Sequence, residues 1–247
     1  DYPVDHHHGR YAGTDSLPDL HFYPVPSYGL PLGVMIPENT EGLIVAEKSI
    51  SVTNIVNGTT RLQPVVLQIG QAAGTLAALA VRDDRKVSEV SVRDVQNKLL
   101  TAGGYLLPYL DVSTDHFWFG PLQRIGATGI MKGVGRNAGW SNQTFFRSAD
   151  TLLLSELAGL LEYYPLEIMF TDTPVTIKGA TDLIRAIAAG TGTDVREEEV
   201  SGALQLIDFE DTAESDRMIL RGEMAVLIDA LLDPFNRVEV DIKGNLK

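Results

Sequence analysis

The stretch from Gly42 to Ala80 constrains the fold more than any other part of the chain, and it reads GLIVAEKSISVTNIVNGTTRLQPVVLQIGQAAGTLAALA. Its first apolar run, Leu43–Ala46, lies between turn-forming residues and predicts a buried strand. A loop rich in Thr, Asn and Gly follows. A helix rich in small residues is then expected from about Pro64 to Val81. A strand, a polar loop and a helix N-terminus in this order form a corner that suits an anion or a dinucleotide.

One face of this predicted helix carries very little side-chain bulk. The residues on it are Gly70, Ala73, Gly74, Ala77 and Ala78. Because these side chains are so small, a strand or another backbone can approach the helix closely along this face.

The same segment resembles the C-terminal end of the flavin-binding domain in FAD-dependent oxidoreductases with two dinucleotide-binding domains, some of which carry LLVAG…IS…R…GQAAGTAAALA. The resemblance implies an α/β domain that binds FAD. It also implies transfer of a hydride or electron pair between FAD and an organic substrate, a small molecule or a sugar-like compound.

In such enzymes a Gly-rich turn, G-x-G-x-x-G, holds the FAD pyrophosphate, and no such turn precedes residue 42 here. The chain is therefore expected to be the C-terminal piece of a longer flavoprotein. Its partner would be the missing N-terminal part of its own flavin domain. Alone, it is expected to lack activity and not to retain FAD.

The resemblance also implies site residues. Arg61 lies at a position close to the isoalloxazine, where a guanidinium can bind an anionic substrate or the reduced flavin; alternatively, it stabilises a surface loop. The backbone amides of the helix start would face the flavin pyrimidine, and a helix N-terminus stabilises negative charge there. The residues assigned to the cofactor are Ala46, Gln63, Val65, Val66 and Leu67, since Pro64 has no N–H.

Three histidines follow Asp5, and His8 is assigned as a candidate acid or base because the family carries an Asp-x-His element on its substrate side. No metal site is expected, because consecutive residues of an extended segment point to opposite faces. Histidines of an ordinary loop are the alternative. The surrounding residues 1–40 are rich in Pro and Gly and predict extended loop and edge strand.

A second helix is expected after Ser91, a candidate N-cap, with Gly103 and Gly104 as its stop. A domain boundary is placed at about residue 104. The fold class predicted is α+β: residues 1–104 are a remnant of an α/β FAD-binding domain, and residues 105–247 are a mainly α-helical repeat domain.

Residues 105–235 resemble a degenerate triple S-layer homology repeat. The resemblance is carried by Tyr109 with Asp111 and Val112, His116 with Trp118, the sequence GIMKG from Gly129 to Gly133, and Glu156 with Ala158. Two later helix starts, at 175–180 and 219–225, repeat the pattern. The resemblance implies binding of a cell-envelope glycan through Trp118, Trp140, Lys132 and Arg221, because aromatics stack on sugars and cations pair with acidic substituents. Alternatively, the repeats only pack or mediate self-association.

Residues 133–139 (GVGRNAG) superficially match a dinucleotide fingerprint. That motif needs a strand before it and a helix after it. The preceding residues have a helical pattern and the following ones start no apolar helix, so a turn between helices is expected.

Charge and composition exclude several classes of function. With 33 acidic and 20 basic residues, the formal net charge is -13, which disfavours nucleic-acid binding. No apolar stretch is expected to reach the ~20 residues that a membrane span requires. The absence of Cys excludes disulfides and thiolate chemistry. The localisation expected is the cell envelope or secretion, with the cytoplasm as the alternative.

Overall fold

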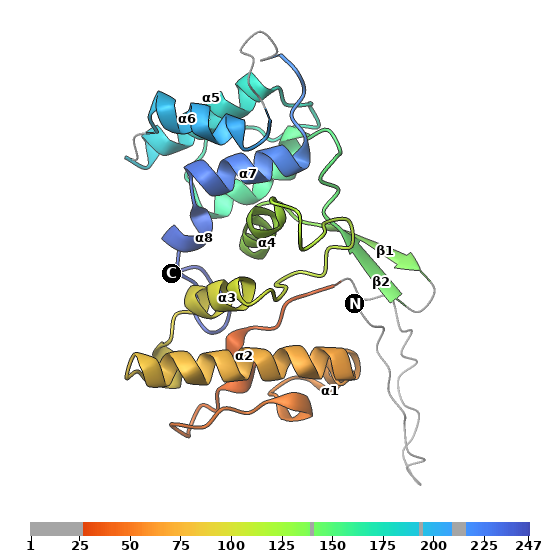
Figure 1. The fold of residues 1–247 in the computed structure, drawn as a ribbon, viewed down its shortest axis with the longest axis vertical. Coiled ribbons are helices and arrows are strands. Elements are labelled where there is room, and N and C mark those ends of the chain that lie inside the picture. Colours follow the sequence, from red (N-terminus) through yellow and green to blue (C-terminus); the bar gives the residue numbers. More distant parts are fainter. Residues whose placement is uncertain (1–26, 139–140, 193–194, 209–215) are drawn as a thin grey trace. The chain divides into compact units, whose positions relative to one another are not determined.

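The computed structural model describes residues 27–138, 141–192, 195–208 and 216–247, and it has a mixed α+β fold (Figure 1). The chain divides into two compact units. Unit 1 consists of residues 1–104, 135–144 and 240–247, and unit 2 of residues 105–134 and 145–239. The predicted α+β class is confirmed.

Unit 1 is built on one long helix. The helix α2, Gln63–Arg82, follows the short helix α1, Asn54–Thr60, and precedes α3, Val92–Thr101. Three 3₁₀ turns complete the unit: η1 (Leu32–Met35), η2 (Glu47–Ser49) and η3 (Val87–Glu89). Strands β1 (Val134–Ala138) and β2 (Ser141–Phe145) form a two-stranded sheet, most of which belongs to this unit.

The helices of unit 1 begin and end where their capping residues predict. Pro64 lies in the first turn of α2, where a missing N–H costs no intrahelical bond. The Ser91 side chain accepts a hydrogen bond from the Asp94 amide (3.2 Å) and caps α3. Gly103, with φ of 78°, ends it in the left-handed conformation that glycine adopts freely. The predicted α2 and the Ser91 cap are confirmed.

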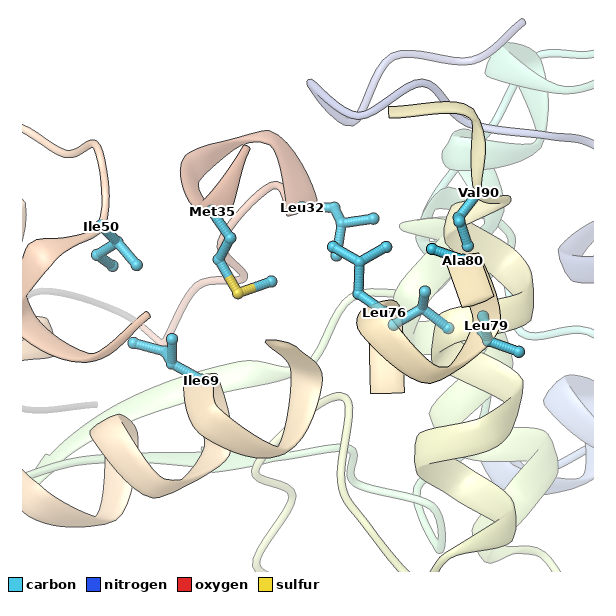
Figure 2. Packing of buried hydrophobic residues seen from close by; sticks show 9 residues of the cluster. Leu32, Met35, Ile50, Ile69, Leu76, Leu79, Ala80 and Val90 are labelled. Carbon is cyan, nitrogen blue, oxygen red and sulfur yellow. The ribbon is translucent and has the colours of Figure 1, made fainter. Parts of the chain in front are cut away.

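The core of unit 1 lies on one side of α2 (Figure 2). Ile69 and Leu76 of α2 lie beside Met35 and Leu32 of η1, Ala80 lies beside Val90, and the cluster also contains Ile50, Leu79 and Val95. These α2 positions are separated by seven, three and one residues, a pattern that keeps them on one helix face.

Two sequence predictions in this unit are wrong. Leu43–Ala46 is extended but not a buried strand: Leu43 is exposed and the other three are half-buried. The Val45 amide donates to the Met35 carbonyl (2.8 Å), but that carbonyl belongs to a 3₁₀ turn, so no ladder can continue from it. Residues 134–138, expected to form a turn, are strand β1 because they pair with β2.

Unit 2 is helical. Its elements are α4 (Phe119–Thr128), η4 (Leu154–Glu162), α5 (Ile177–Gly190), α6 (Glu197–Gln205), α7 (Arg221–Leu231) and α8 (Pro234–Arg237). Helix α7 forms the centre of the unit, since nine of its eleven residues are buried. The predicted helix starts at 175–180 and 219–225 are confirmed as the N-termini of α5 and α7, whereas the segment around Glu156 forms a 3₁₀ helix.

The segments that precede η4, α5 and α7 meet in a closed ring of backbone hydrogen bonds. The Leu152 amide donates to the Ile219 carbonyl (2.9 Å), Ile219 donates to Val175 (2.9 Å), and Val175 donates to Leu152 (3.1 Å). Each of the three residues is buried and lies two positions before its helix. The three segments therefore occupy equivalent places, as expected of repeated units.

Candidate flavin and substrate site

The candidate site in unit 1 is the corner between α1 and α2. Arg61 is the C-cap of α1, and its amide donates to the Asn57 carbonyl (3.1 Å). Leu62 is the extended N-cap of α2. Because only these two residues connect the helices, the half-buried Arg61 is held directly before the N-terminus of α2.

The first amides of α2 have no acceptor within their own helix, and they lie at the positive end of its dipole. The Val66 amide already donates to the Leu62 carbonyl (2.9 Å), so the helical hydrogen bonds begin there and Leu67 follows in the same ladder. Pro64 contributes no N–H. Of the four helix-start residues assigned to the cofactor, Gln63 and Val65 thus have amides that point out of the helix end.

No charged side chain occurs between Arg61 and Arg82. Arg61 is therefore the charged residue nearest in sequence to the N-terminal amides of α2. A guanidinium and two backbone N–H groups together can bind an oxyanion or an electron-rich ring edge.

Residues of α1 support this corner through hydroxyl groups that sequence reasoning missed. The Thr59 and Thr60 hydroxyls donate to the Val56 carbonyl at 2.9 Å and 3.0 Å. The Tyr28 hydroxyl contacts the Thr59 hydroxyl. Because Thr59 uses its proton on Val56, Tyr28 is the donor in this bond, and its oxygen keeps lone pairs for another donor. The sequence signal for Tyr28 was weak, since it lies 31 positions before Thr59.

Ala46 and Glu47 precede α1 in the chain, at the start of η2. Ala46 is half-buried, packs against the core cluster and precedes η2, where its carbonyl accepts from the Ser49 amide (3.3 Å). Glu47 is exposed and has φ of 61°, a left-handed conformation that costs a non-glycine residue about 1 kcal/mol. The pattern LLVAG, carried by the family that this segment resembles, has Gly at the position of Glu47.

His8 lies outside the described residues, and so does Trp140. Among the described residues, no group of three or more His, Cys, Asp or Glu side chains could hold a metal ion.

In unit 2, the three described residues assigned to glycan binding do not form a common exposed surface. Arg221 is 2% exposed: Nε donates to the Phe146 carbonyl (3.0 Å), Nη2 donates to the Lys132 carbonyl (2.9 Å), and the guanidinium pairs with Glu156. It also lies over the Phe146 ring at 5.4 Å. These contacts give Arg221 a structural role in the interior of the unit.

Trp118 is half-buried, and its Nε1 donates to the Leu206 carbonyl (3.1 Å). Its neighbour Phe117 is 62% exposed and stacks on the His116 ring, with a centroid distance of 4.8 Å. The Lys132 side chain is exposed. Of the predicted glycan-facing side chains that are described, only Lys132 is exposed.

Comparison with known proteins gives one family. Residues 1–99 match the family model of FAD dependent oxidoreductases. No curated protein and no solved structure matches the chain. The match includes α1, α2, Arg61 and the connection between them, and it supports a function related to FAD-dependent oxidation. The matched family also implies FAD as its cofactor.

Helix α2 is long and apolar enough, by length and composition alone, to cross a membrane, and it is the one such helix among the described residues. The prediction that no apolar stretch reaches this length is wrong. A core helix of a soluble protein passes the same test, and 22% of the apolar window of α2 is buried.

Proposed function

We propose that residues 1–104 form one part of the flavin-binding domain of an FAD-dependent oxidoreductase that acts on an organic substrate. The observation that carries the proposal is the α1–α2 corner, where Arg61 precedes the open N-terminus of α2 within the matched residues. The pyrophosphate-binding part of the domain would be supplied by further polypeptide, because the sequence before residue 42 has no Gly-rich turn.

The donors at this corner fit the electron-rich edge of a flavin. The Gln63 and Val65 amides would hold that edge, and the α2 dipole would stabilise negative charge that accumulates there. Bound FAD supplies the acceptor or donor of the electron pair. Arg61 binds and polarises the substrate, or neutralises the reduced cofactor, through its guanidinium. Tyr28 is oriented by Thr59 of α1 and offers its phenol oxygen as a hydrogen-bond acceptor beside α1.

The experiment is an FAD titration of this chain and of the natural polypeptide that contains it, followed by flavin absorbance and fluorescence. We expect the natural polypeptide to bind FAD and this chain alone to bind it at least about 100-fold more weakly, because most of the cofactor contacts lie elsewhere. Absence of FAD from the natural polypeptide would contradict the proposal.

An Arg61→Ala variant of the natural polypeptide tests the role of the guanidinium. We expect the rate of flavin reduction by substrate to fall about 10- to 1000-fold, the range for loss of a charged group that stabilises the reaction. Arg82→Ala is the matched control, because Arg82 lies at the opposite end of α2 and pairs with Asp83. Equal rates of flavin reduction in the two variants would show that Arg61 takes no part in the reaction.

The glycan-binding alternative stays a prediction from sequence. The contacts of Trp118 and Arg221 do not favour it, because both side chains are used within unit 2. The repeats of unit 2 fit a packing role through the ring of hydrogen bonds that joins Leu152, Val175 and Ile219.

A further inference from the structure

Residues 240–247 belong to unit 1, although the helices that precede them in the chain, from α4 to α8, belong to unit 2. This 240–247 segment is bound to η1, because the Gly33 amide donates to the Ile242 carbonyl (2.7 Å). Leu32 and Met35 of the same 3₁₀ turn are buried in the core of unit 1 (Figure 2). The segment therefore holds a turn that also supplies part of the core.

This contact explains the glycine at position 33. The φ of Gly33 does not lie in the left-handed region, so its backbone conformation is open to any residue. A Cβ atom at this position would, however, lie 2.8 Å from the Ile242 carbonyl oxygen and 3.5 Å from the Ile242 carbonyl carbon. Both are backbone atoms, which no side-chain rotation can move away. The lack of a side chain at Gly33 thus permits the close approach of the 240–247 segment.

The 240–247 segment is a turn that its own hydrogen bonds hold closed. Val240 and Leu246 form an antiparallel bridge, and the Asp241 amide donates to the Asn245 carbonyl (2.8 Å). The Asp241 carboxylate accepts from two backbone amides of the turn (2.8 Å and 2.9 Å) and from the Asn245 side chain (3.0 Å). Because Ile242 lies within this ordered turn, its carbonyl is held in the position that η1 requires.

The carbonyls of η1 in turn bind two segments that lead into the candidate site. The Met35 carbonyl accepts from the Val45 amide (2.8 Å), and the next residue is Ala46, a predicted cofactor residue. The Val34 carbonyl accepts from the Ser51 amide (2.8 Å), shortly before α1 begins. The position of η1 therefore determines where both segments lie.

The chain just before η1 reaches the same site. Tyr28 contacts the Thr59 hydroxyl of α1, and α1 ends at the C-cap Arg61. Groups that bind a ligand must be held precisely by the residues around them, and here η1 and its flanking residues provide that support for α1.

We infer that the 240–247 segment positions the candidate flavin site by fixing η1, with Asp241 and Ile242 as positioning residues that lie outside the matched residues 1–99. This inference rests on the proposed function. Loss of the segment's grip on η1 would increase the motion of residues 45–62 and weaken FAD binding without removing any group assigned to the cofactor.

Hydrogen exchange followed by mass spectrometry, in the natural polypeptide, measures this motion without any enzyme activity. Asp241→Ala removes the acceptor of three hydrogen bonds within the segment and leaves the sequence of η1 unchanged. Asp241→Asn is the conservative variant, because its amide oxygen can still accept from the two backbone amides. Gly33→Ala places a Cβ atom against the Ile242 carbonyl. Gly29→Ala is its matched control, since a Cβ atom there would meet nothing within 4 Å.

We expect Asp241→Ala and Gly33→Ala to raise amide exchange in residues 45–62 at least about 10-fold, and Asp241→Asn and Gly29→Ala to raise it less than about 3-fold, because only the first two open this region locally. Amides of α7, in unit 2, should keep their rates in all four variants. Unchanged exchange of residues 45–62 in Asp241→Ala or in Gly33→Ala would overturn the inference. An equal increase in α7 would also overturn it, because general destabilisation would then account for the effect.

An FAD titration of the same variants gives the functional readout. We expect the Kd for FAD to rise about 10-fold in Asp241→Ala and to return toward the natural value in Asp241→Asn. An unchanged Kd in Asp241→Ala would overturn the inference and leave the proposed function standing. Absence of FAD from the natural polypeptide would contradict the proposed function, whereas faster exchange of residues 45–62 would still support the hold of the 240–247 segment on η1.

Discussion

The Arg221 guanidinium pairs with the Glu156 carboxylate and joins the first turn of α7 to the first turn of η4. The same carboxylate accepts a hydrogen bond from the Leu153 amide through its other oxygen (3.0 Å). Arg221 further donates to two carbonyls, those of Phe146 and Lys132. One buried cation thus connects four segments of unit 2.

Removal of this cation should be costly. We expect Arg221→Ala to lower the free energy of unfolding by about 3–5 kcal/mol, because it leaves the Phe146 and Lys132 carbonyls without a donor and Glu156 without its cation. Urea unfolding followed by circular dichroism measures the change. Lys178→Ala is the matched control. Its ion pair with Asp182 is exposed, and we expect a loss of less than about 0.5 kcal/mol. A loss below about 1 kcal/mol in Arg221→Ala would show that the contacts of Arg221 are not needed for stability.

Two glycines of unit 2 should respond to alanine in opposite directions. A Cβ atom on Gly159 would lie 2.7 Å from the Gly129 carbonyl oxygen and 2.7 Å from the Ile130 Cα, both of which are backbone atoms that cannot move away alone. We expect Gly159→Ala to destabilise the protein by about 1–3 kcal/mol. Gly202 lies inside α6 with nothing within 4 Å. Gly202→Ala should stabilise by about 0.5–1 kcal/mol through its higher helix propensity. Thermal unfolding of the two variants measures both signs, and a shift of the same sign in both would contradict the packing of η4 on Gly129.

Unit 2 should lose stability in alkali. Burial raises the pKa of the Tyr164 phenol to about 12, and burial also raises the pKa of Tyr109. A raised pKa in the folded state means that the unfolded chain loses its phenol protons first, beginning near pH 10. The stability that these two residues confer is therefore complete below about pH 10. It falls as the pH rises toward the folded-state pKa of about 12 for Tyr164.

The test is the free energy of unfolding as a function of pH from 8 to 12, with Tyr164→Phe as the variant. Phenylalanine cannot ionise, so the variant should lose less stability over this range than the natural sequence, whatever its stability at pH 8. Parallel curves for the two proteins would show that Tyr164 titrates alike in the folded and unfolded states.

The elements that the sequence predicts well are those whose signals are local. Helices α2 and α3 follow from small-residue periodicity, the Ser91 cap and Gly103. The starts of α5 and α7 follow from their similar patterns. Local signals fail where a partner decides the outcome. Leu43–Ala46 has strand composition but meets the 3₁₀ turn at Met35. The polar residues of β1 become a strand because β2 pairs with them.

In the candidate site, too, the sequence predicts the local features but not the long-range contacts. Arg61 must lie close to the start of α2, because α2 begins only two positions later, at Gln63. The role of Tyr28 depends on a contact with Thr59 that no local pattern reports. For Arg221, the sequence pattern suggests a role that the structure does not support. A cation in a recognisable motif suggests a ligand, but its acceptors are backbone carbonyls that sequence does not place.

The left-handed Glu47 gives a final prediction. At φ of 61°, a side chain with a Cβ is strained and glycine is not. We expect Glu47→Gly to stabilise the protein by about 0.5–1 kcal/mol, because relief of this strain exceeds the added freedom of glycine in the unfolded chain. Glu38→Gly is the matched control. Glu38 does not belong to the residues with positive φ, and its replacement should destabilise by a similar amount. Denaturant unfolding of both variants measures the difference. Destabilisation by Glu47→Gly would mean that the Glu47 side chain makes contacts worth more than the strain. The place to seek them would then be the predicted cofactor site beside Ala46.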